Sequence, residues 1–417
     1  MSLTLTRRAA LKGGAALAAC ALAAGACPGS IRAARAEEPE VFAGGAPDAK
    51  TWDLWRKRGW VKEAACYAKM DGAVACCLCP NACVLNIGDR GRCRNRVNVN
   101  GILYTMAYAN PCALHVDPVE KKPLYHFLPG TRTFSLATAG CVLRCLNCQN
   151  WDISQRTPEE TKDARGDEFR LTPERIGKFS ADEARRATLT PEDLPDVAAA
   201  LRCASVSYTY SEPVAYYEYA LDSARAVRAR GLRNILVTSG YILPAPLKDL
   251  AQWTDAAHVD LKGFDEATYV KLNGGPMRPV LDALITLRSA GVWVEIVNLI
   301  VPTYTDKLET IKRMCAWIAD KMGPDTPLHF SRYHPAHKLR LPPTPVDILE
   351  KARAAGRAAG LRYVYVGNAP EVREAGVTLC PKCRKAVADR DIYSMKSMDI
   401  RNGQCPSCGA KIAGVWK

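Results

Sequence analysis

The chain has 417 residues, 48% of them apolar and 24% charged, which is the composition of a folded globular protein large enough for more than one module. Its formal charge is +14, but the positive residues are spread along the chain, so the charge alone does not predict a nucleic-acid partner. Most of its eighteen cysteines fall in three tight groups. In a chain of this size such clustering favours metal ligation over a disulfide framework.

Residues 1–36 are predicted to be a leader that is not part of the fold. A pair of arginines precedes a weakly apolar stretch that is too short to span a bilayer. The run from Thr6 to Lys12 resembles a twin-arginine signal, a route used by proteins that load cofactors before export, and an ordinary basic leader is the alternative. Cleavage after Ala36 and lipoprotein processing at Cys20 both remain open. The leader predicts export to the periplasm or the membrane surface, and a cytoplasmic protein if it is retained.

Residues 133–370 alternate between strand and helix patterns. Near-continuous apolar runs indicate parallel strands that are buried on both faces, and several of the helical runs end in glycine. About six or seven such units predict an α/β fold with a full or partial (β/α) TIM-type barrel, in preference to an open doubly wound sheet. The expected strands are TFSLATAG, ASVSYTYSEP, RNILVTSG, AAHVDLKGF, VWVEIVNLIVP, PLHFSRYHP and YVYVGN.

Other segments flank or interrupt this central block. Residues 37–132 are expected to form a linker and an N-terminal cysteine-rich module. Residues 156–188 are strongly charged and are expected to be a surface insertion with a short helix after Pro173. Residues 371–417 lack barrel character and are expected to form a small separate module. No later segment is apolar enough to cross a membrane.

The most specific short motif is the loop TAGCVLRCLNCQNWD, which contains Cys141, Cys145 and Cys148. Four cysteines hold a [4Fe-4S] cluster whose only task is to carry electrons. Three cysteines from one loop would leave one iron open to another ligand, as catalytic zinc sites keep one position free. The loop follows the first expected strand, and barrel active sites lie at the carboxyl ends of strands. A zinc site completed by residues elsewhere is the alternative.

The spacing of these cysteines and the sequence GCVLRCLNCQN resemble the radical S-adenosylmethionine (radical SAM) enzymes, and among them glycyl-radical activating enzymes such as pyruvate formate-lyase activase. From Cys66 to Trp416 the chain is also similar to the radical enzyme of the AmmeMemoRadiSam system. The resemblance implies that a 5′-deoxyadenosyl radical, formed by reductive cleavage of SAM, abstracts hydrogen from a substrate. The similar segments are CLCPNAC, RGRC, DPVEKKPLYHFLPG, CQNWDISQ, YTYSEP, VTSGYI, VDLKGF, HFSRYHP, YVYVGNAP and the paired C-terminal knuckles.

The same resemblance implies which side chains contact the cofactor. Glu212 would accept a hydrogen bond from the ammonium group of SAM, although Tyr210 and Ser211 stand where the family usually has glycines. Asp260 and Lys262 would meet the ribose hydroxyls and the methionine carboxylate. Further cofactor contacts are implied for Ser211, for Ser239 with the ribose, for His334 near the adenosyl group, for Gln149, and for Asn147, which replaces an aromatic residue that the adenine usually packs against.

Each of these residues also has a structural alternative. Glu212 could cap the helix that begins near Pro213. Asp260 and Lys262 could form a buried ion pair, and His334 could be a core histidine. Three of the cysteines outside these groups lie in apolar contexts and are expected in the core: Cys112, Cys203 and Cys315.

Two further cysteine groups flank the barrel. The C-terminal group matches a zinc ribbon whose four thiolates would close a structural tetrahedral site, with nucleic-acid binding as the weaker alternative; its members are Cys380, Cys383, Cys405 and Cys408. The N-terminal group could hold zinc or an accessory iron–sulfur cluster, and zinc or an undefined metal is favoured; its members are Cys76, Cys79, Cys83 and Cys93.

The leading hypothesis is therefore a radical SAM enzyme that uses a [4Fe-4S] cluster and SAM, with zinc as a structural metal. Such an enzyme needs an electron donor of the flavodoxin or ferredoxin type. Its substrate is unidentified and could be a protein, and no nucleic-acid partner is expected. The alternative is a non-catalytic iron–sulfur or zinc adaptor for electron transfer or partner binding. Substrate contacts come from loop tips, where sequence patterns carry little chemistry.

Overall fold

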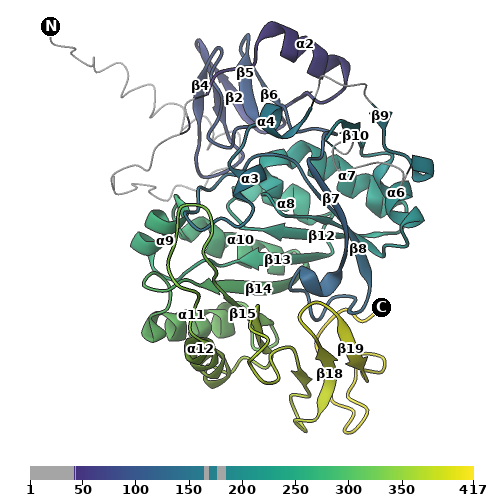
Figure 1. Cartoon of the computed structure of the whole chain (residues 1–417), viewed down its shortest axis with the longest axis vertical. Helices are drawn as coiled ribbons and strands as arrows, with labels where there is room; N and C mark the ends of the chain where they lie inside the picture. The colour runs from purple at the N-terminus through teal and green to yellow at the C-terminus, as the bar shows by residue number, and fades with distance from the viewer. Residues whose placement is uncertain (1–41, 43, 164–168, 176–184) are drawn as a thin grey trace, which may run out of the picture.

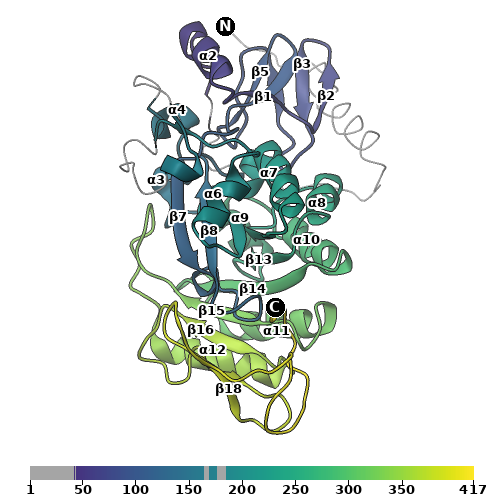
Figure 2. The same cartoon turned by 90° about the vertical axis from the view of Figure 1, so that its right-hand side faces the viewer.

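The structure is a computed structural model that describes residue 42 and residues 44–163, 169–175 and 185–417. The leader predicted at residues 1–36 and part of the charged insertion lie outside the described residues. A central α/β unit carries a small β-rich module at each end of its long axis (Figures 1 and 2). None of the helices in the described ranges has both the length and the apolar character needed to cross a bilayer.

Eight strands form the central sheet, in the order β16-β15-β14-β13-β12-β11-β8-β7. All neighbouring pairs are parallel except β7, which pairs antiparallel with β8 at one edge. The two edge strands do not pair with each other, so the predicted barrel is of the partial kind, and each expected strand is present. The strands are β7 (Ala113–Pro118), β8 (Arg132–Ala137), β11 (Ser205–Tyr208), β12 (Arg233–Thr238), β13 (Ala256–Asp260), β14 (Trp293–Ile300), β15 (Leu328–Arg332) and β16 (Val364–Gly367).

Amphipathic helices connect the parallel strands. On α11 (Leu308–Lys321), Ile311, Met314 and Ile318 recur at intervals of three and four residues and are buried, which is the pattern of a helix lying on a sheet. Helix α9 (Glu266–Asn273) ends at Gly274, whose φ of +81° is the left-handed conformation typical of a helix end. The others are α6 (Leu194–Ala200), the 3-10 turn η3 (Pro213–Tyr216), α7 (Tyr217–Ala229), α8 (Pro244–Ala251), α10 (Arg278–Ser289) and α12 (Val346–Ala358).

The N-terminal module contains two small antiparallel sheets and one helix. One sheet has the order β2-β3-β4 and the other β1-β6-β5. Trp55 and Trp60 are fully buried, and their rings meet edge to face with centroids 5.2 Å apart, which fixes the helix on the second sheet. The elements are α2 (Ala49–Lys57), β1 (Lys62–Glu63), β2 (Tyr67–Met70), β3 (Ala73–Cys76), β4 (Val84–Asn86), β5 (Arg96–Val99) and β6 (Ile102–Thr105).

The charged insertion is described only in part. A 3-10 turn, η2 (Pro173–Arg175), begins at the residue after which the sequence predicts a short helix. Two very short strands, β9 (Phe169–Arg170) and β10 (Ala187–Thr188), pair in parallel on either side of it. The short helices α3 (Trp151–Ser154) and α4 (Pro158–Thr161) precede them.

The C-terminal module is packed against the barrel. Its sheet comprises β17 (Thr378–Leu379), β18 (Ala386–Arg390) and β19 (Met395–Met398). The ring of His126, just after the 3-10 turn η1 (Val119–Lys121), lies 2.6 Å from the Ala413 carbonyl oxygen and 2.7 Å from the hydroxyl of Tyr365. The segment around His126 therefore joins the barrel to this module.

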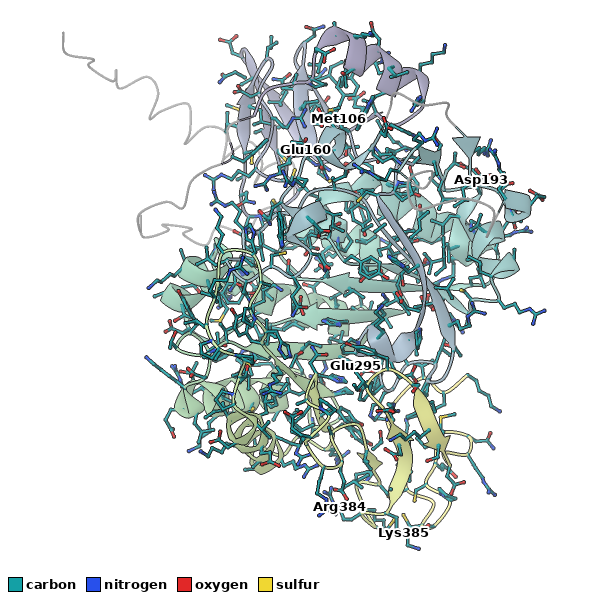
Figure 3. The ribbon with its side chains drawn as sticks, viewed as in Figure 1. Met106, Glu160, Asp193, Glu295, Arg384 and Lys385 are labelled. Carbon is teal, nitrogen blue, oxygen red and sulfur yellow. The ribbon has the colours of Figure 1, made fainter. Side chains whose placement is uncertain are left out.

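A fully buried carboxylate on β14 holds that joint together. Glu295 accepts hydrogen bonds from the backbone amides of Tyr125 and His126 at 3.0 and 2.7 Å, and lies 2.8 Å from Nε2 of His329. Figure 3 shows Glu295 between the central sheet and the C-terminal module. Burial opposes its ionisation, but His329, His126 and the Tyr125 amide lower the pKa of Glu295 to about 2.

We expect Glu295→Ala to lower the free energy of unfolding by about 3–5 kcal/mol, because it leaves buried donors without an acceptor. Denaturant unfolding followed by circular dichroism measures the change. Because the folded-state pKa is depressed, this stabilisation is present above pH about 4.5 and is lost as the pH falls toward 2. The control is Glu309→Ala, at an exposed ion pair on α11, with an expected change of about 0.5 kcal/mol or less. An equal effect of the two substitutions would contradict this role.

Candidate active site

The three cysteines of the predicted cluster loop follow β8 at the carboxyl edge of the parallel sheet. Cys145 is buried, and Cys141 and Cys148 are partly buried. Gly140 precedes them with φ of +89°, and a Cβ there would lie 2.3 Å from the Cys93 carbonyl oxygen. Only glycine fits that position. The N-terminal module therefore fixes where the loop begins, at the edge of the sheet where barrel active sites lie.

The sulfur atoms of this loop lie among few polar neighbours. The backbone amide of Leu143 donates to Cys141 Sγ at 3.4 Å, and Cys148 Sγ lies 3.0 Å from the Ser154 hydroxyl. Burial raises the pKa of all three thiols, to about 12 for Cys145. A bound metal centre would supply the positive charge that thiolates need in such surroundings.

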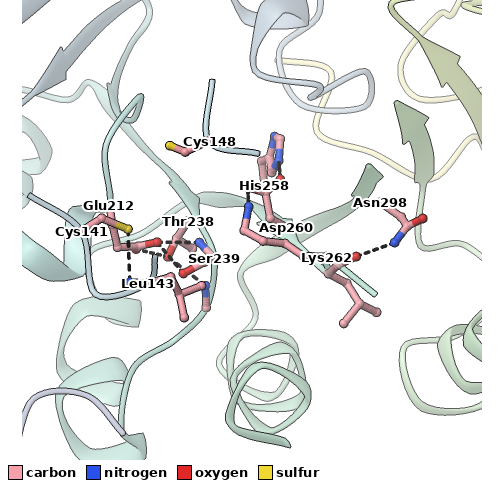
Figure 4. A network of polar contacts seen from close by, with 12 residues as sticks. Cys141, Leu143, Cys148, Glu212, Thr238, Ser239, His258, Asp260, Lys262 and Asn298 are labelled. Atoms are coloured by element: carbon pink, nitrogen blue, oxygen red, sulfur yellow. Dashed lines mark hydrogen bonds and ion pairs between the residues drawn. The ribbon is translucent and has the colours of Figure 1, made fainter. Parts of the chain in front are cut away.

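Glu212 lies on one side of the loop, and both of its carboxylate oxygens accept hydrogen bonds. Its Oε2 accepts from the amide and hydroxyl of Ser239 at 2.8 and 2.6 Å, and its Oε1 accepts from the Thr238 hydroxyl at 2.5 Å (Figure 4). Oε1 also accepts from the Val214 amide at 3.3 Å, which is the capping contact that the structural alternative expects. Burial raises the pKa of Glu212, whereas the Ser239 and Thr238 hydrogen bonds oppose the rise. Two predicted cofactor residues, Glu212 and Ser239, thus lie together.

The backbone before Glu212 keeps a conformation that suits glycine. Tyr210 has φ of +62°, in the left-handed region, which costs a residue with a side chain on the order of 1 kcal/mol. Its hydroxyl group donates to Asp117, and its carbonyl oxygen accepts from Asn150 at 2.8 Å. Ser211 donates to the Thr138 carbonyl oxygen at 2.7 Å. Although Tyr210 and Ser211 replace the glycines usual in the family, the backbone at Tyr210 still has the left-handed conformation that glycine favours.

Asp260 and Lys262 lie on the other side of the loop (Figure 4). The ammonium group of Lys262 donates to Asp260 Oδ2 at 2.7 Å, so the ion pair of the structural alternative is formed. His258 Nε2 lies 2.8 Å from Asp260 Oδ1, and its Nδ1 lies 2.8 Å from the Lys122 carbonyl oxygen. Both ring nitrogens of His258 therefore lie within hydrogen-bond distance of an oxygen acceptor. Burial would raise the pKa of Asp260, but Lys262 and His258 hold it well below its usual range.

These two sides act differently on the cluster thiols. The carboxylate of Glu212 adds to burial in raising the pKa of Cys141. Burial raises the pKa values of Cys145 and Cys148, and the positive charge of Lys262 opposes that rise. The loop is therefore flanked by a negative group on one side and a cationic group on the other.

The remaining predicted residues are not all brought into this site. Asn147 is buried between the second and third cysteines, and its Oδ1 has no hydrogen-bond partner among the described residues. Such an unpaired acceptor costs about 1–3 kcal/mol, and a bound donor would remove that cost. Gln149 and His334 are exposed, so neither is held in place by burial.

Asn298 was not singled out from the sequence. It lies on β14 and is buried, and its side-chain amide donates to the Leu261 carbonyl oxygen at 2.7 Å. This contact fixes the backbone between Asp260 and Lys262. Its Oδ1 lacks a partner within the described part of the chain. The sequence signal that could have identified Asn298 is its polar side chain within the otherwise largely apolar expected strand VWVEIVNLIVP.

Comparison with known proteins places this geometry in a family. Residues 135–318 match the family model described as "Radical SAM superfamily". The chain contains a radical SAM domain. The pyruvate formate-lyase-activating enzyme of Clostridium pasteurianum is 26% identical over 186 residues, which are 45% of this chain and 68% of that enzyme. An uncharacterized protein of Methanocaldococcus jannaschii is 40% identical over 356 residues, 84% of this chain and 99% of that protein. Among solved structures, SuiB of Streptococcus suis bound to S-adenosylmethionine gives a TM-score of 0.41, with 12% identity over 60% of this chain and 53% of SuiB.

A radical SAM domain implies a [4Fe-4S] cluster and SAM, and the residues present fit both. Cys141, Cys145 and Cys148 offer three thiols from one loop, one buried and two partly buried, and Asn147 offers an acceptor beside them that has no partner among the described residues. The cluster, when bound, supplies the single electron that cleaves a carbon–sulfur bond of SAM. The chain itself provides donors and acceptors at fixed positions on both sides of the loop, which are suited to orienting a charged ligand without reorganisation.

We expect His258→Phe to raise the dissociation constant for SAM about tenfold, because Asp260 loses a hydrogen bond worth about 1–1.5 kcal/mol that fixes its position. Phenylalanine keeps the volume of the buried ring. Anaerobic equilibrium binding measures the affinity, and the thermal midpoint controls for loss of fold. An unchanged affinity in a folded variant would show that the imidazole does not position Asp260.

Proposed function

We propose that this radical SAM enzyme is an activating-enzyme-like oxidoreductase, which forms a 5′-deoxyadenosyl radical and uses it to abstract hydrogen from a protein substrate. The observation that carries the proposal is the three-cysteine loop flanked by Glu212 and by the Asp260–Lys262 pair. The similarity to the pyruvate formate-lyase-activating enzyme of Clostridium pasteurianum supports the proposal that the substrate is a protein. The similarity of short segments such as CQNWDISQ and VDLKGF to the AmmeMemoRadiSam radical enzyme supports a related role.

In this proposal the residues on the two sides of the loop contact different parts of SAM. Glu212, held by Ser239 and Thr238, accepts from the ammonium group of SAM. Lys262 is suited to the methionine carboxylate, and Asp260 to the ribose hydroxyls. Asn147 can accept from the exocyclic amine of the adenine through its unpaired Oδ1. These contacts would hold SAM against the one iron that lacks a cysteine.

The leader supports a proposal on localisation. Its twin-arginine-type sequence fits a protein that is exported after it has folded and acquired its cluster. An electron donor of the flavodoxin or ferredoxin class would then have to be reachable on the side where the enzyme works. The non-catalytic adaptor remains the second candidate, and it predicts clusters without SAM cleavage.

The decisive test is Cys145→Ala. Incubated without oxygen with SAM and a strong chemical reductant, the unaltered chain should release 5′-deoxyadenosine and methionine, and the variant should release neither. Chromatography of the products measures both. The matched control is Cys315→Ala, which removes a fully buried thiol on α11 far from the three groups in sequence and should leave the release unchanged. Equal release by both variants would remove catalysis from this loop.

We also propose that the C-terminal cysteines bind structural zinc. Cys380 and Cys408 Sγ lie 3.6 Å apart, Cys383 and Cys405 Sγ lie 3.7 Å apart, and all four sulfurs lie within 4.8 Å of one another. Four thiolates at about 2.3 Å from one zinc ion are separated by about 4 Å, which this spacing matches. The four sulfurs pack with a small apolar cluster that includes Tyr363, Tyr365 and Ile412.

Cys405→Ser is expected to lower the zinc content by one ion per chain and to lower the thermal midpoint, because a closed structural site contributes folding free energy. Elemental analysis and a thermal melt measure the two effects. Cys315→Ala serves again as the control. If zinc content and midpoint both stay unchanged in Cys405→Ser, the site is not a zinc ribbon.

A further inference from the structure

The N-terminal module brings a second set of four cysteines close to the catalytic loop. Cys76 ends β3, Cys79 and Cys83 lie on the loop from β3 to β4, and Cys93 lies just before β5. Cys76, Cys79 and Cys93 are all less than 8% exposed, and Cys83 is partly buried. The backbone amide of Cys76 donates to the Cys83 carbonyl oxygen at 2.9 Å, and all four cysteines pack in the same core cluster. The four sulfurs thus share one buried region.

The spacing of these sulfurs differs from that of the C-terminal group. Among the residues that the structure describes, only the C-terminal cysteines form a group of three or more ligand atoms within 4.8 Å of one another. Neither the four N-terminal cysteines nor the three catalytic cysteines include three sulfur atoms that lie this close to one another. A single zinc ion holds thiolates about 4 Å apart. A cubane places irons and sulfides between them, so its thiolates are farther apart. In lacking such a close set of sulfurs among the described residues, the N-terminal group is like the catalytic loop and unlike the C-terminal group.

The fourth cysteine of this group directly precedes the residues that contact the catalytic loop. A Cβ on Gly140 would meet the Cys93 carbonyl oxygen at 2.3 Å. Asn95 donates to the Ala139 carbonyl oxygen at 2.6 Å and to that of Ala215 at 3.0 Å. Arg94, between Cys93 and Asn95, is partly buried. The segment of residues 93–95 therefore links the N-terminal cysteine group directly to the start of the catalytic loop.

Cationic groups surround the N-terminal cysteines. Arg96 Nη1 lies 4.0 Å from Cys76 Sγ, and Arg96 is fully buried in an ion pair with Glu218 at 2.6 Å. Burial raises the pKa of Cys83, and the Arg92 backbone and charge oppose that rise. A cluster held by four thiolates carries net negative charge, and nearby cations and hydrogen-bond donors stabilise it and tune its potential.

We infer that Cys76, Cys79, Cys83 and Cys93 bind a second iron–sulfur cluster, which passes electrons to the catalytic one. Four cysteines saturate a cubane, as in clusters that only carry electrons. One electron from a donor of the flavodoxin or ferredoxin class reduces the second cluster, which is reoxidised as it reduces the catalytic cluster. That electron then breaks a carbon–sulfur bond of SAM and yields methionine and the 5′-deoxyadenosyl radical. The destination of the electron rests on the proposed function, and the binding of iron does not.

The test of binding uses the full chain with the catalytic cysteines removed. After anaerobic reconstitution with iron and sulfide, the triple variant Cys141→Ala, Cys145→Ala and Cys148→Ala should retain about four irons and four sulfides, against about eight of each in the unaltered chain. Its reduced form should give an electron paramagnetic resonance signal that SAM does not alter. A triple variant that holds no iron and one zinc ion more than the C-terminal site requires would overturn the inference.

The test of electron delivery uses Cys76→Ala with Cys83→Ala. This variant should lose about four irons, keep the SAM-dependent resonance signal, and release 5′-deoxyadenosine more than tenfold slower with a reduced flavodoxin while staying within twofold with dithionite. Equal slowing with both reductants would overturn the relay. If this variant fails to fold, the iron count of the triple variant still decides binding. If the unaltered chain does not cleave SAM, the proposed function is wrong. The iron content of the triple variant would still test whether the N-terminal cysteines bind a cluster.

Discussion

The active site depends on one close contact between the N-terminal module and the barrel. Gly140 has no room for a side chain because the Cys93 carbonyl oxygen occupies that space. Asn95 binds carbonyl oxygens of the cluster loop and of η3, so a single buried amide holds three segments that are far apart in the sequence. The module is therefore a wall of the site, and the orientation of the first catalytic cysteine depends on how well it packs.

The polar groups around the loop are arranged before any ligand binds. Glu212 receives hydrogen bonds from both Ser239 and Thr238, and Asp260 is held by Lys262 and His258. Groups whose positions are fixed in this way need not reorganise when a charged ligand arrives. The same contacts satisfy the capping and ion-pair alternatives. For these residues, the structural and functional interpretations describe one arrangement.

The sequence predicted the parts of this structure that repeat along the chain. Apolar strands buried on both faces and amphipathic helices carry strong local patterns, so the seven parallel strands were identifiable without the structure. Asn95, His258 and Asn298 were missed because their importance lies in contacts with residues distant in sequence or with backbone carbonyls, which no local pattern encodes. The antiparallel edge strand β7 was missed for the same reason, since its pairing depends on where the N-terminal module meets the barrel.

The segment between β7 and β8 connects the two ends of the molecule. Lys122 donates to Asp117 at 2.7 Å, and its carbonyl oxygen lies 2.8 Å from the His258 ring that holds Asp260. A few residues on, the Tyr125 and His126 amides donate to Glu295, where the C-terminal module is attached. One short buried segment therefore supplies contacts both to the histidine that holds Asp260 and to the carboxylate at which the C-terminal module is attached. The position of Asp260 and the attachment of that module thus depend on the same stretch of backbone.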